Sequence, residues 1–436
     1  MTNSVITRSM VAASMFWVLA GSSAEAQPVP SSGELEALRK MVQDVIKQNE
    51  DLRKRVQELE ATTQKRGQVA DAPAKPAGES APAAAEPAKD VAKTARDKIQ
   101  LGGAIEVEAR KTRDFHGVQS SDLLLSTAEF DFEADVVDWA KAELSLQWIS
   151  PTTSFPATPD DKITVNEAMI TFAKPSVTPF YLKTGRGVVP FGISTGTTVA
   201  ARLDESLTIT GPLTLEIFEA KEDHLLIGYR DHGITIGAYV FNGDTNNSKR
   251  GKQLEHGGFA VSYGRKGETL SFDVGLGWID SVFDTDGLSR AFPEIVLKKN
   301  SDYTPGVAAF VRAGLFGFSF IAEYDTAIRS ANFIRGGQQR STQPEAWQVE
   351  LGYTTSLFGL KPFAAFNYSK SYQMYGAFPK RRTLYTVGSW LSENIRAAFE
   401  YNNERDYNRA HGGAIQPTRR DGAESDTLTL RLTYEW

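Results

Sequence analysis

The chain has 436 residues, with 48 Lys and Arg against 54 Asp and Glu, a net charge of −6 and no cysteine. The mild acidity excludes the strongly basic face that nucleic-acid binding requires. The lack of cysteine excludes disulfide scaffolds, thiolate metal sites and cysteine nucleophiles. Beyond the N-terminus, no run of about 18 apolar residues predicts a transmembrane helix.

Residues 1–26 are predicted to be a signal peptide. Arg8 precedes an apolar run from Met10 to Leu19, and Ala24 and Ala26 supply the small residues of a cleavage site. A short membrane anchor is the alternative, but this run is too short to span a bilayer. We therefore expect an exported bacterial protein that begins near Gln27.

Residues 27–64 are expected to form a periplasmic coiled-coil helix. Apolar residues recur at steps of three and four, and Asn49 is the single polar residue in the stripe. An amphipathic helix packed on its own domain is the alternative, although its apolar stripe would be wider. A parallel coil implies a homo-oligomer, a dimer or a trimer. The predicted oligomerisation residues are Leu35, Leu38, Val42, Val45, Asn49, Leu52, Val56 and Leu59.

Residues 65–98 are rich in Ala, Pro, Lys and Glu and have no apolar periodicity, which predicts a solvated linker. From about Ile99 the period changes to two, as in strands with one apolar and one polar face. Sixteen strands are predicted, at roughly 99–111, 122–135, 139–149, 162–174, 179–188, 223–230, 233–242, 257–265, 268–281, 304–314, 317–329, 344–355, 360–371, 381–391, 394–406 and 426–436.

The connections decide how these strands assemble. A soluble sandwich would pack the apolar faces together, whereas a membrane barrel would turn them to lipid. Links after even-numbered strands are short and flanked by aromatic residues, as in the turns and girdle of an outer-membrane barrel. Links after odd-numbered strands are long: 112–121, 150–161, 189–222, 243–256, 282–303, 330–343, 372–380 and 407–425. We predict an all-β fold, a 16-stranded antiparallel transmembrane β-barrel over residues 99–436 in the bacterial outer membrane.

The last strand alternates apolar and polar residues and ends on an aromatic residue. Such an ending resembles the assembly signal of bacterial outer-membrane barrels, carried here by Tyr434 and Trp436. The resemblance implies the barrel assembly machinery and outer-membrane lipid as partners.

A barrel of about 16 strands leaves an aqueous channel. The longest link, 189–222, is the third long one, and by position it resembles the loop that narrows the pore of trimeric porins. Mixed charge at a constriction orients polar solutes; the alternative is that these charges solvate a surface loop. The predicted constriction residues are Lys183, Arg186, Arg202, Asp204, Glu205 and Glu219. The predicted lumen-facing residues are Glu129, Asp131, Glu133, Lys141, Glu143, Asp273, Glu350, Arg396 and Glu400.

Several motifs carry a resemblance to known porins. The stretch from Tyr181 to Gly192, ending Pro-Phe-Gly, is similar to an element of phosphate-selective-type porins. The whole plan of the chain resembles the LbtU family of siderophore porins. It has an export signal, a coil and a linker, followed by the motifs Gly102–Val107, Asp161–Ala168 and Arg202–Ser206. That resemblance implies passive uptake of a ferric siderophore without a plug domain. The segment before the first strand, read as coil and linker, agrees with a barrel that has no plug.

No enzyme, metal site or cofactor is predicted. The stretch Gly192–Gly196 matches the G-x-S-x-G elbow, but that motif needs a buried strand, a sharp turn and a helix. The five histidines are scattered. Three functions stay open: a ferric-siderophore porin, a general or phosphate-type diffusion porin, and a tether from outer membrane to cell wall.

Overall fold

A computed structural model describes residues 98–150, 162–193, 198–245, 254–267, 269–296, 303–408 and 422–436. The predicted signal peptide, the coiled-coil stripe and all but the last linker residue lie outside these residues. Among the described residues, no helix is long and apolar enough to cross a membrane.

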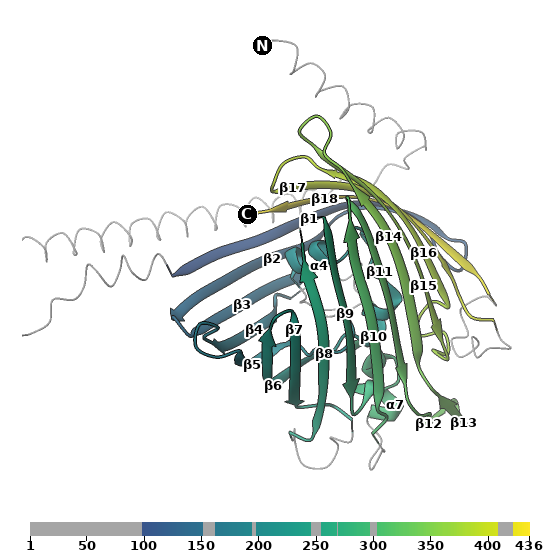
Figure 1. The fold of residues 1–436 in the computed structure, drawn as a ribbon. Coiled ribbons are helices and arrows are strands. Elements are labelled where there is room, and N and C mark those ends of the chain that lie inside the picture. Colours follow the sequence, from purple (N-terminus) through teal and green to yellow (C-terminus); the bar gives the residue numbers. More distant parts are fainter. Residues whose placement is uncertain are drawn as a thin grey trace, which may run out of the picture. The chain divides into compact units, whose positions relative to one another are not determined.

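Sixteen antiparallel strands close into one barrel (Figure 1). Each pairs with its neighbours in sequence, except that β11 pairs with β14 and β1 closes the barrel against β18. All sixteen predicted strands are confirmed to within three residues at each end, and the soluble sandwich is wrong. The strands are β1 (Ile99–Arg113), β2 (Gln119–Val137), β3 (Ala140–Ile149), β4 (Thr164–Ala173), β5 (Phe180–Val188), β6 (Lys221–Asp231), β7 (Ile234–Phe241), β8 (His256–Lys266), β9 (Leu270–Ile279), β10 (Gly306–Leu315), β11 (Phe318–Ala327), β14 (Glu345–Thr354), β15 (Lys361–Tyr372), β16 (Arg381–Trp390), β17 (Ile395–Arg405) and β18 (Glu424–Glu435).

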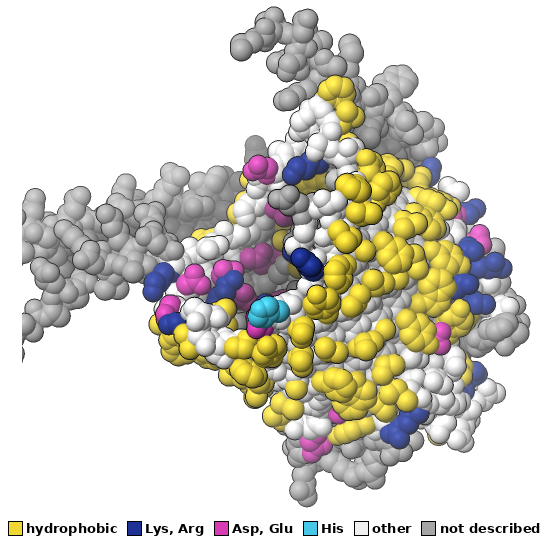
Figure 2. All heavy atoms as spheres, viewed as in Figure 1, with side chains coloured by type: hydrophobic (Ala, Val, Ile, Leu, Met, Phe, Trp, Pro, Cys, Tyr) yellow, Lys and Arg dark blue, Asp and Glu magenta, His cyan; other side chains and the backbone are white. Residues whose placement is uncertain are grey.

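The outer wall of the barrel is apolar, and its interior contains many buried polar side chains together with an apolar core. Large apolar side chains such as Leu276, Leu351 and Val387 are 51–59% exposed. Figure 2 shows hydrophobic side chains covering one face of the wall. Successive residues of a strand point to opposite faces. Glu350, which directly precedes the exposed Leu351 on β14, is buried. Apolar side chains outside and polar side chains inside are what a lipid-embedded barrel requires.

Three short turns share one backbone geometry. His232-Gly233, Phe316-Gly317 and Phe358-Gly359 all have positive φ, 49° to 52° at the first residue and 76° to 84° at the glycine. Two positive φ values in succession define the type I′ turn, whose twist matches that of the flanking strands. The short links therefore fix the register of their hairpins.

A matched pair of glycines tests how tightly these turns are packed. A Cβ on Gly233 would lie 2.3 Å from the carbonyl oxygen of Gly264, whereas one on Gly359 would meet nothing within 4 Å. Gly359→Ala is expected to cost about 1–2 kcal/mol, from the left-handed backbone alone. Gly233→Ala should cost clearly more, because the neighbouring strand must also move. Urea unfolding followed by heat-modifiable gel mobility measures both, and equal losses would contradict the packing argument.

At the other end of the barrel, termed the long-loop end, the links fold together. The predicted link 330–343 contains a hairpin that the sequence pattern missed, β12 (Ala331–Arg335) with β13 (Gln338–Thr342). The link after β9 forms η2 (Val282–Asp284), α6 (Asp286–Ala291) and α7 (Pro293–Val296). Their apolar residues share one buried core, which includes Phe283, Phe292, Phe333, Met374 and Phe378.

An ion pair joins two of these links. Arg335 of β12 donates two hydrogen bonds to the Glu294 carboxylate of α7, at 2.6 and 2.7 Å. The guanidinium holds the pKa of Glu294 below its usual value. The contact is therefore kept at neutral pH and lost only as the pH falls through that lowered pKa.

Candidate functional site

The link between β5 and β6 crosses the interior of the barrel. It contains two short helices, α4 (Val199–Glu205) and α5 (Leu213–Phe218). The hydroxyl of Thr198 caps α4 by accepting a hydrogen bond from the backbone N–H of Ala201 at 3.2 Å. The link contacts strands as distant as β2 and β17, through Val199 and Ile209. It is termed the inner loop below.

Four wall glutamates hold the inner loop by its backbone. Each carboxylate accepts at least one backbone N–H of the loop, so groups that would otherwise be buried without a partner are satisfied. The pairs are Glu323 with Ile193, Glu129 with Val199 (2.8 Å), Glu350 with Leu207 (3.1 Å), and Glu400 with both Ile209 (2.7 Å) and Thr210 (3.0 Å). These carboxylates act as fixed latches for the loop.

Neighbouring polar side chains complete each latch. Thr386 donates to Glu400 at 2.7 Å, and Gln147 donates to Glu129 at 2.7 Å. Glu323 accepts from Thr214 of the loop at 2.6 Å and from Gln348 of the wall at 2.9 Å. With partners on both sides, the carboxylates have little freedom to rotate away from the loop.

Two wall arginines bind the opposite backbone group. Arg396 donates to the carbonyl oxygen of Leu207 at 2.5 Å, and Arg382 donates to that of Gly211 at 2.7 Å. Arg382 also lies 2.6 Å from Glu216 of α5 and 2.6 Å from Glu404 of β17. The stretch from Leu207 to Gly211 is thus held to the barrel wall through both its backbone N–H groups and its backbone carbonyl oxygens.

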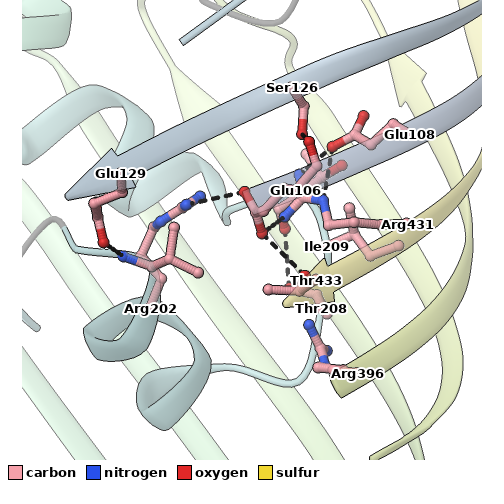
Figure 3. Close-up of polar contacts among 12 residues, drawn as sticks. Glu106, Glu108, Ser126, Glu129, Arg202, Thr208, Ile209, Arg396, Arg431 and Thr433 are labelled. Carbon is pink, nitrogen blue, oxygen red and sulfur yellow. Dashed lines mark hydrogen bonds and ion pairs between the residues drawn. The ribbon is translucent and has the colours of Figure 1, made fainter. Parts of the chain in front are cut away.

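A cluster of buried ion pairs lies beside α4. Arg431 of β18 is 3.1 Å from Glu106 and 2.5 Å from Glu108, both on β1, and these carboxylates are 1% and 0% exposed. Arg202 of α4 points at the same Glu106 from the loop side, at 3.2 Å (Figure 3). The cluster links the closing seam of the barrel to the inner loop.

The Pro-Phe-Gly element begins the inner loop. Phe191 is 2% exposed and belongs to the buried core of the long-loop end. Gly192 has φ +72°, and a Cβ there would lie 2.5 Å from the Glu323 carboxylate. Glycine lets the backbone pass close to this glutamate, so that the next N–H, that of Ile193, can donate to it.

The six predicted constriction residues have different surroundings. Arg202 joins the ion-pair cluster. Arg186 pairs with Asp223 at 3.4 Å, and Lys183 lies opposite Leu226 in the β5–β6 register. The Glu219 carbonyl oxygen accepts the N–H of Asp286 at 2.8 Å. The remaining two, Asp204 and Glu205, belong to α4, and their side chains lie outside what the structure describes.

The predicted lumen residues fall into two groups. Glu129, Glu350, Arg396 and Glu400 contact the inner loop. The others lie along the wall: Lys141 between Glu133 (2.6 Å) and Glu143 (3.2 Å), Asp273 beside Arg312, and Asp131 two residues from Glu129 on β2. Their lining of an open pore stays a prediction.

Sequence reasoning missed several residues of this site, among them Glu106, Glu108 and Arg382. The first two alternate with Ile105, Val107 and Ala109 on β1, which is the same period of two that marked other lumen residues. That alternation could have placed them on the polar face. No comparable pattern marks Arg382 as a contact of the inner loop.

The two aromatic residues of the predicted assembly signal lie at the closing seam. The rings of Tyr434 and Trp436 stack with centroids 5.8 Å apart, and both side chains are about half exposed. The backbone N–H of Trp436 donates to the carbonyl oxygen of Gly103 on β1 at 3.2 Å. The last residue therefore contributes to the seam that closes the barrel.

Within the described ranges, no group of three or more His, Asp and Glu side chains is arranged to hold a metal ion. Ser194 of the G-x-S-x-G match lies outside those ranges.

Comparisons with known proteins place the fold. No family model matches the chain. It is 25% identical over 331 residues to a UPF0422 protein of Coxiella burnetii (strain RSA 493 / Nine Mile phase I). The match covers 72% of this chain and 65% of the relative, so the chain spans less than two thirds of that relative's length. Among solved structures, it is similar to the outer membrane channel DcaP of Acinetobacter baumannii and to Salmonella typhi OmpF in complex with daunomycin. Each has a TM-score of 0.50 and 13% identity, over 78% of this chain and 97% of that structure. The chain has the fold of outer-membrane porins.

Proposed function

We propose that this protein is an outer-membrane channel through which small polar solutes diffuse past the inner loop. One observation carries the proposal: the inner loop crosses a closed sixteen-strand barrel and is latched to the wall by carboxylates and arginines. Barrels of this size have an aqueous lumen. A loop fixed across that lumen would narrow it permanently and would not act as a gate. The fold shared with a protein described as an outer membrane channel supports the proposal.

The charges along the proposed path favour cations over anions. Near the constriction, Arg202, Arg382 and Arg431 are paired with carboxylates. Arg396 instead donates to the carbonyl oxygen of Leu207. Towards the short turns, Glu133 and Glu143 share the single Lys141. Figure 2 shows acidic side chains beside β2 and β3, with Lys and Arg side chains among them. A surplus of carboxylates raises the local cation concentration.

For the preferred solute we propose a ferric siderophore, on the resemblance to the LbtU family. Two motifs of that resemblance, at Gly102–Val107 and Arg202–Ser206, are almost 100 residues apart in sequence. Their charged members Glu106 and Arg202 meet in one ion pair at 3.2 Å. This contact supports the idea that the motifs form a single site in the pore. A general or phosphate-type diffusion porin is the alternative.

Channel conductance tests the function and the solute together. The refolded chain is inserted into a planar bilayer and titrated first with a ferric siderophore, then with the iron-free siderophore, and then with phosphate. We expect an open channel that only the ferric form blocks at low micromolar concentration. An ohmic channel indifferent to siderophores would leave a general porin, and block by phosphate alone would favour the phosphate-type porin. Absence of conductance would refute the channel itself.

The domain organisation is proposed as signal peptide 1–26, periplasmic coiled coil 27–64, linker 65–98 and barrel 99–436. The heptad stripe supports assembly into a dimer or trimer through the coil. Deleting residues 27–98 separates assembly from tethering to the cell wall. Loss of the oligomer with weakened transport would support assembly, whereas envelope defects with intact conductance would support the tether.

A further inference from the structure

Three cations lie side by side on neighbouring strands at the long-loop end. Lys370 near the end of β15 pairs in register with Arg381, the first residue of β16, and Arg381 pairs with Arg405, the last residue of β17. Like charges directly opposite each other destabilise a sheet. The arrangement is therefore unfavourable unless anionic groups compensate the three side chains.

All three side chains point to the outer wall. On β15, Ser369 and Ser371 on either side of Lys370 are fully buried inside the barrel. On β16, Arg382 reaches inward to the inner loop, so Arg381 faces outward. On β17, Arg405 shares its face with Phe399, which is 38% exposed on the apolar wall.

The cations stand at the edge of the apolar belt. On the same face, further from the long-loop end, lie Tyr385 and Val387, both more than half exposed. The Lys370 ammonium lies over the rings of Trp347 (5.9 Å) and Tyr368 (5.6 Å). Figure 2 shows Lys and Arg side chains along the border of the hydrophobic surface. Aromatic and basic side chains at such a border occupy the depth of lipid headgroups.

The positive charge of the three cations is only partly compensated by a nearby carboxylate. Glu424 of β18 lies opposite Arg405 and is 3.5 Å from Arg381. Arg381 also donates to Asn403 at 2.9 Å, and its Nε has no hydrogen-bond partner. Among the described residues, Glu424 is the one carboxylate within ion-pair distance of these three cations, which leaves a surplus of two positive charges there. A phosphate group, with several acceptor oxygens, suits two guanidinium groups and an ammonium at once.

We infer that Lys370, Arg381 and Arg405 form a binding site for the phosphate groups of an anionic lipid of the outer leaflet. The inference rests on the outer-membrane placement proposed above. A lipid is the occupant because the three cations face the bilayer at the border of an apolar wall, where acyl chains pack below and headgroups lie beside the cations. Bound lipid would brace β15, β16 and β17 where their links begin.

Lipid binding to the whole chain in detergent micelles tests the site. The probes are bisphosphorylated lipid A and its dephosphorylated form, with bound lipid counted by native mass spectrometry. We expect the bisphosphorylated form to bind more tightly. The variant Lys370→Ser/Arg381→Ser/Arg405→Ser should lose roughly 100-fold in affinity, since each cation near anionic lipid contributes about fivefold. The control Arg265→Ser/Lys266→Ser, which removes two exposed cations at the short-turn end of β8, should bind as the unaltered chain does.

Equal affinity of the triple variant and the unaltered chain would overturn the site, as would equal binding of the two lipids. Displacement of the lipid by equimolar inorganic phosphate would also overturn it, because the site would then take soluble anions. Heat-modifiable gel mobility shows that each variant is folded. Conductance of the same samples keeps the two proposals apart: a chain that binds lipid A but does not conduct refutes the channel alone.

Discussion

Replacing Glu350 and Glu400 together with alanine is expected to raise the single-channel conductance severalfold while the barrel stays folded. These carboxylates accept the backbone N–H groups of Leu207, Ile209 and Thr210. Each buried donor left without a partner costs about 1–3 kcal/mol. With three such donors released at once, the inner loop should leave the wall and seek water. The lumen would then widen, because the loop no longer crosses it. The barrel would stay folded, because the strands keep all their hydrogen bonds.

A matched pair separates the latch from simple loss of charge. Glu133→Ala/Glu143→Ala also removes two carboxylates from the wall, but these bind Lys141 and not the loop. This control should shift ion selectivity and change the conductance little. Single-channel recording at several salt concentrations measures both variants. The latch would be refuted by an equal rise in conductance in the two pairs, or by no rise in either.

The second large effect is expected at the closing seam. Arg431→Met should lower the free energy of unfolding by about 3 kcal/mol, because removing one partner of a buried ion pair leaves uncompensated charge. The loss lies at the low end of the usual range, since Arg202 still pairs with Glu106 and Arg110 still pairs with Glu108. The same variant should become more selective for cations. Guanidinium unfolding and reversal potentials measure the two effects.

An exposed ion pair of the same seam supplies the control. Arg113 pairs with Asp426 across β1 and β18, and the Arg113 side chain is 54% exposed. Arg113→Met is therefore expected to cost at most about 1 kcal/mol, as solvent-exposed pairs do. Adding Glu106→Gln and Glu108→Gln to Arg431→Met should recover part of the lost stability. If the exposed and buried arginines cost the same, burial of the cluster has no energetic consequence.

The alternation of side chains predicted the fold because it is a local property. Whether a residue faces lipid or lumen is decided by its position along its own strand, so the strand ends and the placing of Glu129, Glu350 and Glu400 on polar faces followed from period two. The sorting of short and long links then separated a barrel from a sandwich. The hairpin β12–β13 was not predicted, because its residues, 331–342, have no apolar alternation long enough to distinguish a strand from a loop.

What those polar side chains do was decided by the tertiary structure. Glu129, Glu350 and Glu400 hold the inner loop through hydrogen bonds to residues that are distant in sequence. The separations are 70, 143 and 191 positions, respectively. A carboxylate that faces a lumen and one that holds a backbone N–H have the same sequence pattern. Likewise, Lys370, Arg381 and Arg405 become one cluster only through the register of three strands. Sequence period gives each side chain its face, but only the closed barrel gives it a partner, because contacts across a lumen depend on the geometry of all the strands at once.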